Sequence, residues 1–94
     1  MFKTSEFEEW FEGLPEKSKM IVNARFQRIA VDEHFGFINV FDGIIELKWK
    51  SGMRVYTHRL TKEKLFVLLG GSKNGQSKDI NKAKKILFKL LKGA

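Results

Sequence analysis

The chain contains no cysteine among its 94 residues. Disulfides and thiolate metal sites are therefore excluded, and a reducing compartment is permitted. The apolar runs are far shorter than the roughly 20 residues that a membrane-spanning helix needs. The opening MFKTSEFEEW turns acidic where a signal peptide has its apolar core. We therefore expect a soluble, cytoplasmic protein that binds no membrane.

Acidic residues are scarce in the second half of the chain. Residues 48–94 contain thirteen lysines and arginines but only Glu63 and Asp79 as acids, whereas residues 1–47 contain five basic and nine acidic residues. Such a basic half is typical of a protein with a phosphate-rich partner. The alternatives are an acidic protein segment, a membrane surface, or lysines that only face solvent.

Hydrophobic periodicity predicts three helices in what we expect to be a single domain, residues 1–94. The first begins at a Thr4 or Ser5 cap and ends at Gly13, and the second runs from Pro15 to about Asp32. The third covers about residues 76–91, with lysines along its polar side. Inward positions of the second helix are expected at Val22, Phe26, Ile29 and Ala30, and outward positions at Lys19, Arg25 and Arg28.

Between the second and third helices the pattern changes to short runs rich in β-branched and aromatic residues. FGFINV, GIIELKWK, MRVYTHRL and KLFVLL are separated by turn-like residues, and KLFVLL is apolar throughout, as in a central strand covered on both faces. MFK is a candidate for one more strand. The order predicts an α+β fold with two N-terminal helices and a C-terminal helix packed on a curved antiparallel sheet of three to five strands.

The segment GGSKNGQS, residues 70–77, differs from a nucleotide phosphate loop at Gln76, where that loop has its lysine. No later strand follows to supply a magnesium ligand, so we reject a nucleotide site. Gly70 and Gly71 are expected to provide backbone angles that other residues avoid, at the exit of the buried strand.

Two blocks in tandem carry a resemblance to a known family. GIIELKWKSGMRVYTHR, followed by KLFVLLGGSKNGQSKDINKAK, resembles the RelE/ParE superfamily of type II toxins, and most closely its HigB-like branch of addiction-module killer proteins. The matching positions are Asp42, Gly43, Glu46, Leu47, Arg54, Val55, Tyr56, Leu68, Leu69, Gly70, Gly71, Lys73, Gln76, Asp79, Ile80 and Ala83.

The resemblance implies both an activity and partners. It implies a toxin that cleaves messenger RNA on the ribosome and is restrained by a cognate helix-turn-helix antitoxin. It leaves open the alternative of a ParE-like toxin or binding module that acts on a protein such as DNA gyrase. No cluster with metal-ligand spacing is present in the sequence, so we expect metal-independent chemistry without a cofactor.

Metal-free RNA cleavage needs a base, an acid, and cations that stabilise the phosphorane. We expect Arg54 to bind phosphate through its planar guanidinium, with a salt bridge to Glu46 as the alternative role. Tyr56 lies two residues along the same strand face, where it stacks on a base, moves a proton, or is simply buried. His58 continues that face and titrates near neutrality.

The remaining candidate residues are basic or amide side chains around the glycine segment. Lys73 matches the family lysine and is a candidate contact to the scissile phosphate, so it joins the three catalytic candidates above. Lys48, Lys78 and Lys82 are expected to contact RNA. Gln76 is expected either to contact RNA or to form a hydrogen bond at the start of the helix.

Overall fold

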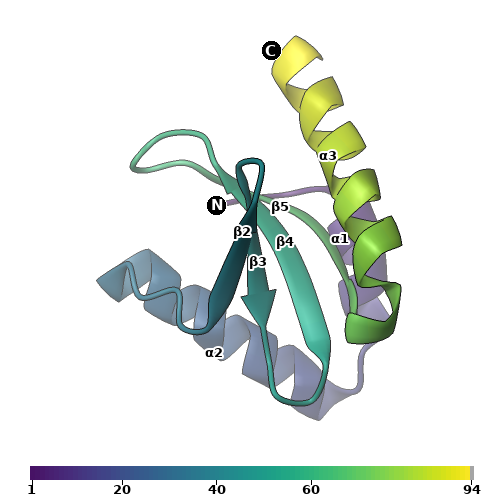
Figure 1. The fold of residues 1–94 in the computed structure, drawn as a ribbon. Coiled ribbons are helices and arrows are strands. Elements are labelled where there is room, and N and C mark those ends of the chain that lie inside the picture. Colours follow the sequence, from purple (N-terminus) through teal and green to yellow (C-terminus); the bar gives the residue numbers. More distant parts are fainter. Residues whose placement is uncertain (94) are drawn as a thin grey trace.

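A computed structural model describes residues 1–93 of the chain. Within that range three α-helices pack on one five-stranded sheet (Figure 1). The helices are α1 (Ser5–Glu12), α2 (Glu16–Asp32) and α3 (Gln76–Gly93), and a 3-10 turn, η1 (Lys73–Gly75), precedes α3. The strands are β1 (Phe2–Lys3), β2 (Ile38–Phe41), β3 (Ile44–Lys48), β4 (Met53–Arg59) and β5 (Leu65–Ser72). The predicted α+β fold is confirmed.

The sheet has the order β1-β5-β4-β3-β2. β2 to β5 form an antiparallel meander, whereas β1 pairs in parallel with β5, so the complete sheet is mixed rather than purely antiparallel. Tyr56 pairs with Leu69 and Thr57 with Val67, which leaves Leu68 as the extra residue of a bulge in β5. The hydroxyl of Thr4, which caps α1, donates to the Leu68 carbonyl at 2.7 Å.

Both faces of the sheet are covered, as the apolar KLFVLL run predicts. On one face, α1 and α2 pack through Phe7, Val22 and Phe26 against side chains that include Leu47 and Val55. On the other face, which is turned toward the viewer in Figure 1, α3 packs through Ala83, Ile86 and Leu87 against Ile44, Tyr56 and Leu68. Polar groups on the inner faces of the sheet therefore have little access to water.

Three expectations for individual side chains and backbone positions were wrong. Ala30 is exposed, because the inward stripe of α2 is narrower than expected. Arg25 does not point into solvent, because its guanidinium bonds to main-chain carbonyls beyond the helix. Gly70 and Gly71 lie within β5, and the glycines with positive φ are instead Gly36, Gly43 and Gly52.

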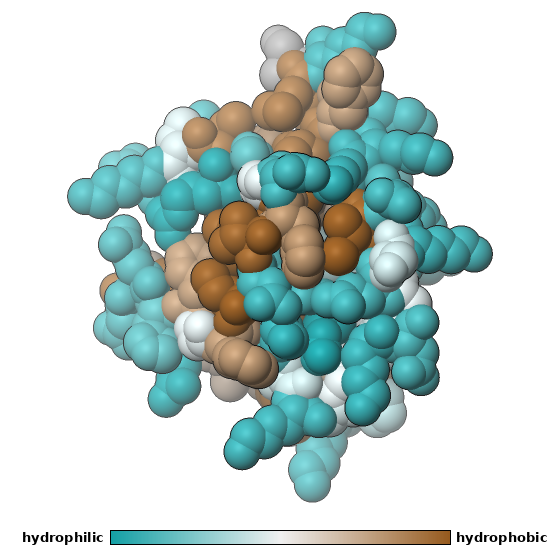
Figure 2. All heavy atoms as spheres, in the orientation of Figure 1, coloured by the Kyte–Doolittle hydropathy of each residue, from teal (hydrophilic) through white to brown (hydrophobic). Residues whose placement is uncertain are grey.

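Strand β2 forms one border of the sheet, and its side chains leave apolar surface exposed. Hydrophobic side chains gather over β2 and β3 in the space-filling view, while polar side chains cover much of the surrounding surface (Figure 2). Phe37, just before β2, is 67% exposed, and Val40 within β2 is 62% exposed. No helix among residues 1–93 is both long enough and apolar enough to cross a membrane.

Candidate functional site

The candidate site is built around the loop of residues 49–52, which connects β3 to β4. Gly52 closes this tight turn with a φ of 101°, and its amide donates to the Trp49 carbonyl at 3.0 Å. The Lys73 amide donates to the Gly52 carbonyl at 2.8 Å. Sequence segments about 20 residues apart, the 49–52 loop and η1, therefore meet at one end of the sheet.

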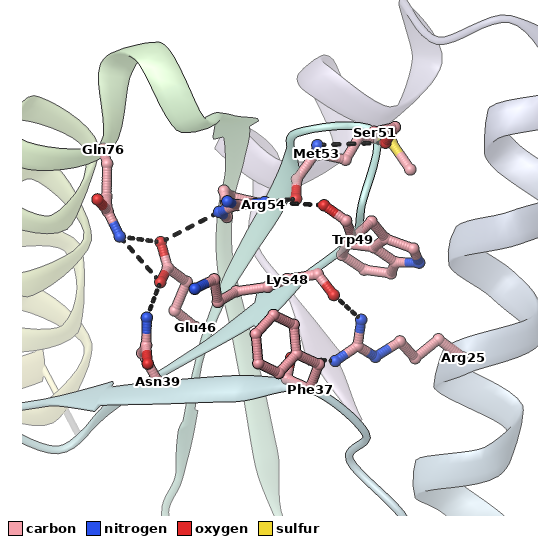
Figure 3. Close-up of polar contacts among 10 residues, drawn as sticks. All are labelled: Arg25, Phe37, Asn39, Glu46, Lys48, Trp49, Ser51, Met53, Arg54 and Gln76. Carbon is pink, nitrogen blue, oxygen red and sulfur yellow. Dashed lines mark hydrogen bonds and ion pairs between the residues drawn. The ribbon is translucent and has the colours of Figure 1, made fainter.

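Arg54 holds this loop from the α3 side of the sheet. Its Nη1 donates to the Trp49 carbonyl at 3.0 Å and to the Met53 carbonyl at 2.8 Å, while its Nε lies 3.7 Å from Glu46 Oε2 (Figure 3). The Nη2 atom donates to no protein acceptor among residues 1–93 and is not enclosed. Arg54 therefore stabilises the loop and forms the expected ion pair, with one edge of the guanidinium left for a ligand.

Glu46 is the centre of a buried polar network between the sheet and the start of α3. Its side chain is fully buried, and its two carboxylate oxygens accept from Gln76 Nε2 at 3.0 and 2.9 Å. Asn39 on β2 donates a further bond of 3.3 Å (Figure 3). These donors offset the cost of burying a carboxylate. Of the two expected roles of Gln76, the structure contains the hydrogen bond at the helix start.

Lys73 is exposed and lies against the same loop as Arg54. A methyl group built on Gly52 would lie 3.5 Å from Cγ and Cδ of Lys73, so the lysine stem runs over this glycine. The segments 48–54 and 73–78 contain no acidic residue. We call Lys48, Lys50, Arg54, Lys73 and Lys78, which these two segments contribute, the basic edge. Glu46 pairs with Arg54 alone, so the edge keeps an excess of positive charge that favours a phosphate-bearing ligand.

Two of the candidate catalytic residues lie outside the basic edge. Tyr56 is fully buried under α3, and burial together with the nearby Glu46 carboxylate raises its pKa. Of the roles considered above, Tyr56 therefore has that of a buried aromatic, and its ring is not accessible to a base. His58 shares the strand face, but its Nδ1 contacts the Gly43 carbonyl at 2.8 Å, about 13 Å along the strand from Arg54.

The two remaining lysines among the RNA-binding candidates have different surroundings. The Lys48 ammonium lies 4.7 Å from the centre of the Phe37 ring, at the border of the sheet. Lys82 lines a groove of about 550 Å³ between α1 and α3, together with Glu6, Glu9 and Trp10. Acidic and basic side chains line this groove together, whereas the two segments of the basic edge carry no acid.

Close packing explains the two adjacent glycines of β5. A methyl group built on Gly70 would lie 2.0 Å from the Trp10 ring, and one on Gly71 would lie 2.2 Å from Asp79 Oδ2. The glycines therefore let α1 and α3 approach the sheet. Burial at this contact raises the pKa of Asp79, and the nearby lysines oppose the shift. Asp79 lies in the first turn of α3, as expected.

The sequence reasoning did not single out Trp49 and Arg25 as parts of the site region. The Arg25 guanidinium lies 4.5 Å from the centre of the Trp49 ring, and its Nη1 donates to the Lys48 carbonyl (Figure 3). A sequence signal existed in the aromatic residues interleaved with cations in LKWK. No group of three or more metal-ligating side chains occurs within the part of the chain that the structure describes.

The chain is similar over nearly its whole length to a known protein. A protein of Haemophilus influenzae, described as uncharacterized, is 33% identical over 90 residues, which cover 93% of this chain and 91% of the relative. No model of a protein family matches the chain. No solved structure matches it either.

Proposed function

This chain belongs to one family with the uncharacterized Haemophilus influenzae protein, and we propose from its site that it is a toxin that cleaves messenger RNA. The proposal joins the resemblance to the HigB-like branch of the RelE/ParE toxins with the geometry of the basic edge. The observation that carries it is the meeting of Arg54 and Lys73 at the 49–52 loop. A guanidinium and an ammonium on one loop suit a single phosphodiester.

The proposed reaction is an attack within the RNA strand. The ribose 2′-oxygen loses its proton and bonds to the adjacent phosphorus, while the bond from phosphorus to the 5′-oxygen breaks and that oxygen gains a proton. The products are a 2′,3′-cyclic phosphate and a 5′-hydroxyl. Arg54 Nη2 and the Lys73 ammonium stabilise the negative charge that develops on the non-bridging oxygens. Because Nη1 donates to two main-chain carbonyls and Nε lies in an ion pair with Glu46, the orientation of the Arg54 guanidinium is set before RNA binds.

The test uses a translation extract to which purified protein is added. We expect cuts within the reading frame of the message, and a loss of rate of about 10²–10³ in Lys73→Gln, as for removal of one group that stabilises the transition state. Lys92→Gln removes the same charge at the far end of α3 and should cleave like the wild type. Intact messages at stoichiometric wild-type protein would exclude the nuclease.

A second function is inhibition of a target by binding without cleavage, as in ParE-like toxins that act on DNA gyrase. The observation that favours it is the position of Tyr56 and His58, which leaves the basic edge with cations but without an adjacent histidine or accessible tyrosine. A supercoiling assay separates the two functions. Inhibition of gyrase by both wild type and Lys73→Gln, with messages intact, would select the second.

We further propose that a helix-turn-helix antitoxin restrains the protein in the cytoplasm, through an acidic segment laid over the basic edge. Such a segment would neutralise the same charges that bind RNA on the ribosome. Co-expression with the product of an adjacent reading frame should restore growth and yield a complex. The charge-reversal variant Lys73→Glu should weaken that complex, whereas Lys92→Glu should not.

A further inference from the structure

A pocket of about 340 Å³ lies between α2 and the segment 34–37, outside the basic edge. Its lining includes Arg28, His34, Phe37 and Trp49. None of the described residues that line the pocket is acidic. Aromatic rings interleaved with cations are the composition of sites that bind single-stranded nucleic acid.

The aromatic walls of the pocket are held in place by Arg25. Its Nε donates to the Phe35 carbonyl at 2.9 Å. Its Nη2 donates to the Phe37 carbonyl at 2.6 Å, and its Nη1 to the Lys48 carbonyl (Figure 3). Gly36 permits this contact, because its φ is 78° and a methyl group there would lie 3.2 Å from Arg25 Nη2. Each nitrogen of the Arg25 guanidinium thus donates to a main-chain carbonyl, and Arg25 organises the pocket.

Two other nitrogen-bearing side chains of the pocket, Arg28 and His34, are available to a ligand. Arg28 and His34 are exposed, and neither forms an ion pair with any of residues 1–93. Phe37 is 67% exposed although it is a large apolar side chain. The ammonium of Lys48 above its ring adds a further positive charge at the rim of the pocket.

The pocket is continuous with the basic edge through Lys48 and Trp49. The Lys48 carbonyl accepts from Arg25 on the pocket side, while the carbonyl of the next residue, Trp49, accepts from Arg54 on the α3 side (Figure 3). An RNA strand with a phosphate at Arg54 thus has an aromatic surface nearby, on the other side of the same loop. Charge and continuity both favour RNA over an apolar peptide as the occupant.

We propose that this pocket binds one unpaired nucleotide of the RNA, and that the neighbouring phosphate of the same RNA strand lies at the basic edge. The base stacks on the exposed ring of Phe37, and Arg28 and His34 contact the adjoining phosphate. This assignment rests on the proposed function for the identity of the ligand, and it adds a base-binding subsite that is separate from the cations at the scissile bond.

The test measures binding of a fluorescent pentanucleotide with 2′-O-methyl riboses, which cannot be cleaved, against an abasic oligomer of equal length. Phe37→Ala should weaken binding of the pentanucleotide at least about fivefold, as loss of one stacked base predicts, and leave the abasic oligomer unchanged. Phe88→Ala is the matched control, because Phe88 is 66% exposed and also has a lysine ammonium near its ring. It should bind both oligomers like the wild type.

A second pair of variants separates stacking from charge. Arg28→Ala should weaken both oligomers more than Lys92→Ala does, although each variant loses one positive charge. Equal affinity of wild type and Phe37→Ala for the pentanucleotide would overturn the assignment and leave a protein as the occupant. Absence of pentanucleotide binding by the wild type, or equal losses for Phe37→Ala and Phe88→Ala, would overturn it as well.

Cleavage measured on the same preparations distinguishes failure of this inference from failure of the proposed function. If wild type binds the pentanucleotide through Phe37 but leaves messages intact, the pocket stands and the nuclease does not. If messages are cut but Phe37→Ala binds like wild type, the nuclease stands and the pocket does not.

Discussion

At the scale of single residues, burial decides what Tyr56 can do. The phenol is fully enclosed between the sheet and α3, close to the Glu46 carboxylate. Ionising it would place a second negative charge in an apolar environment, so the phenol stays protonated in the folded state. Tyr56 is the one tyrosine in the chain, and its titration can therefore be followed without overlap from another.

We predict that the folded protein shows no tyrosinate absorbance at pH 11, while the urea-unfolded protein titrates at about 10. Because the folded pKa is raised above the unfolded value, the folded state holds more protons above pH 10. The free energy of unfolding should therefore fall as pH rises through that range. A spectrum at 295 nm with circular dichroism on the same sample checks both. Tyrosinate that forms near pH 10 without unfolding would contradict the burial of this side chain.

Position 70 requires glycine because there is no space for a side chain, and not because of its backbone angles. Gly70→Ala places a methyl group 2.0 Å from the Trp10 ring, and we expect the free energy of unfolding to fall by about 1–3 kcal/mol. Gly13→Ala is the control, because its methyl would meet its nearest neighbour at 3.5 Å. Urea denaturation of both variants measures the difference. Equal stabilities would show that Trp10 moves aside freely.

At the scale of elements, the side-chain amide of Gln76 connects the start of α3 to the sheet through hydrogen bonds. Gln76 donates to both oxygens of buried Glu46, so Gln76→Ala leaves the carboxylate with fewer donors. We predict a loss of about 1–3 kcal/mol in the free energy of unfolding. Lys78→Ala, two residues on and exposed, should change it by less than about 0.5 kcal/mol. Similar losses in both variants would indicate that helix propensity, not the Glu46 bond, decides the result.

The elements themselves could be predicted from the sequence, whereas much of the site could not. Helix and strand periodicities are local, so the positions of Val22 on α2 and Ala83 on α3 follow from spacing alone. Strand alternation likewise places Arg54, Tyr56 and His58 on one face. It does not say which part of that face α3 covers, so the burial of Tyr56 was left open. The Arg25 contacts join residues 10 to 23 apart across a loop, which no periodic pattern encodes.

At the scale of the whole molecule, the distribution of charge predicts how the proposed RNA binding depends on salt. The net charge is +7, and five of the cations form the basic edge. With about −0.7 in the slope of log K against log salt for each phosphate contact on a single strand, the four phosphodiesters of the pentanucleotide predict a slope of at most about −2.8. Lys73→Gln should reduce its magnitude by about 0.7. Titrations of the pentanucleotide between low and moderate salt measure it, and a slope near zero would argue against phosphate contacts.

Arg54 belongs to the scaffold as well as to the proposed site, and Lys73 belongs mainly to the latter. Under the proposed toxin function, we expect cells that survive forced expression to carry inactivating substitutions of two physically different kinds. Substitutions at Arg54 would leave the buried Glu46 carboxylate without its cation, so little folded protein would accumulate. Substitutions at Lys73 would give a folded but inactive protein. The abundance of each inactive variant in a cell lysate would therefore show whether the Arg54 guanidinium or the Lys73 ammonium is needed for the stability of the fold.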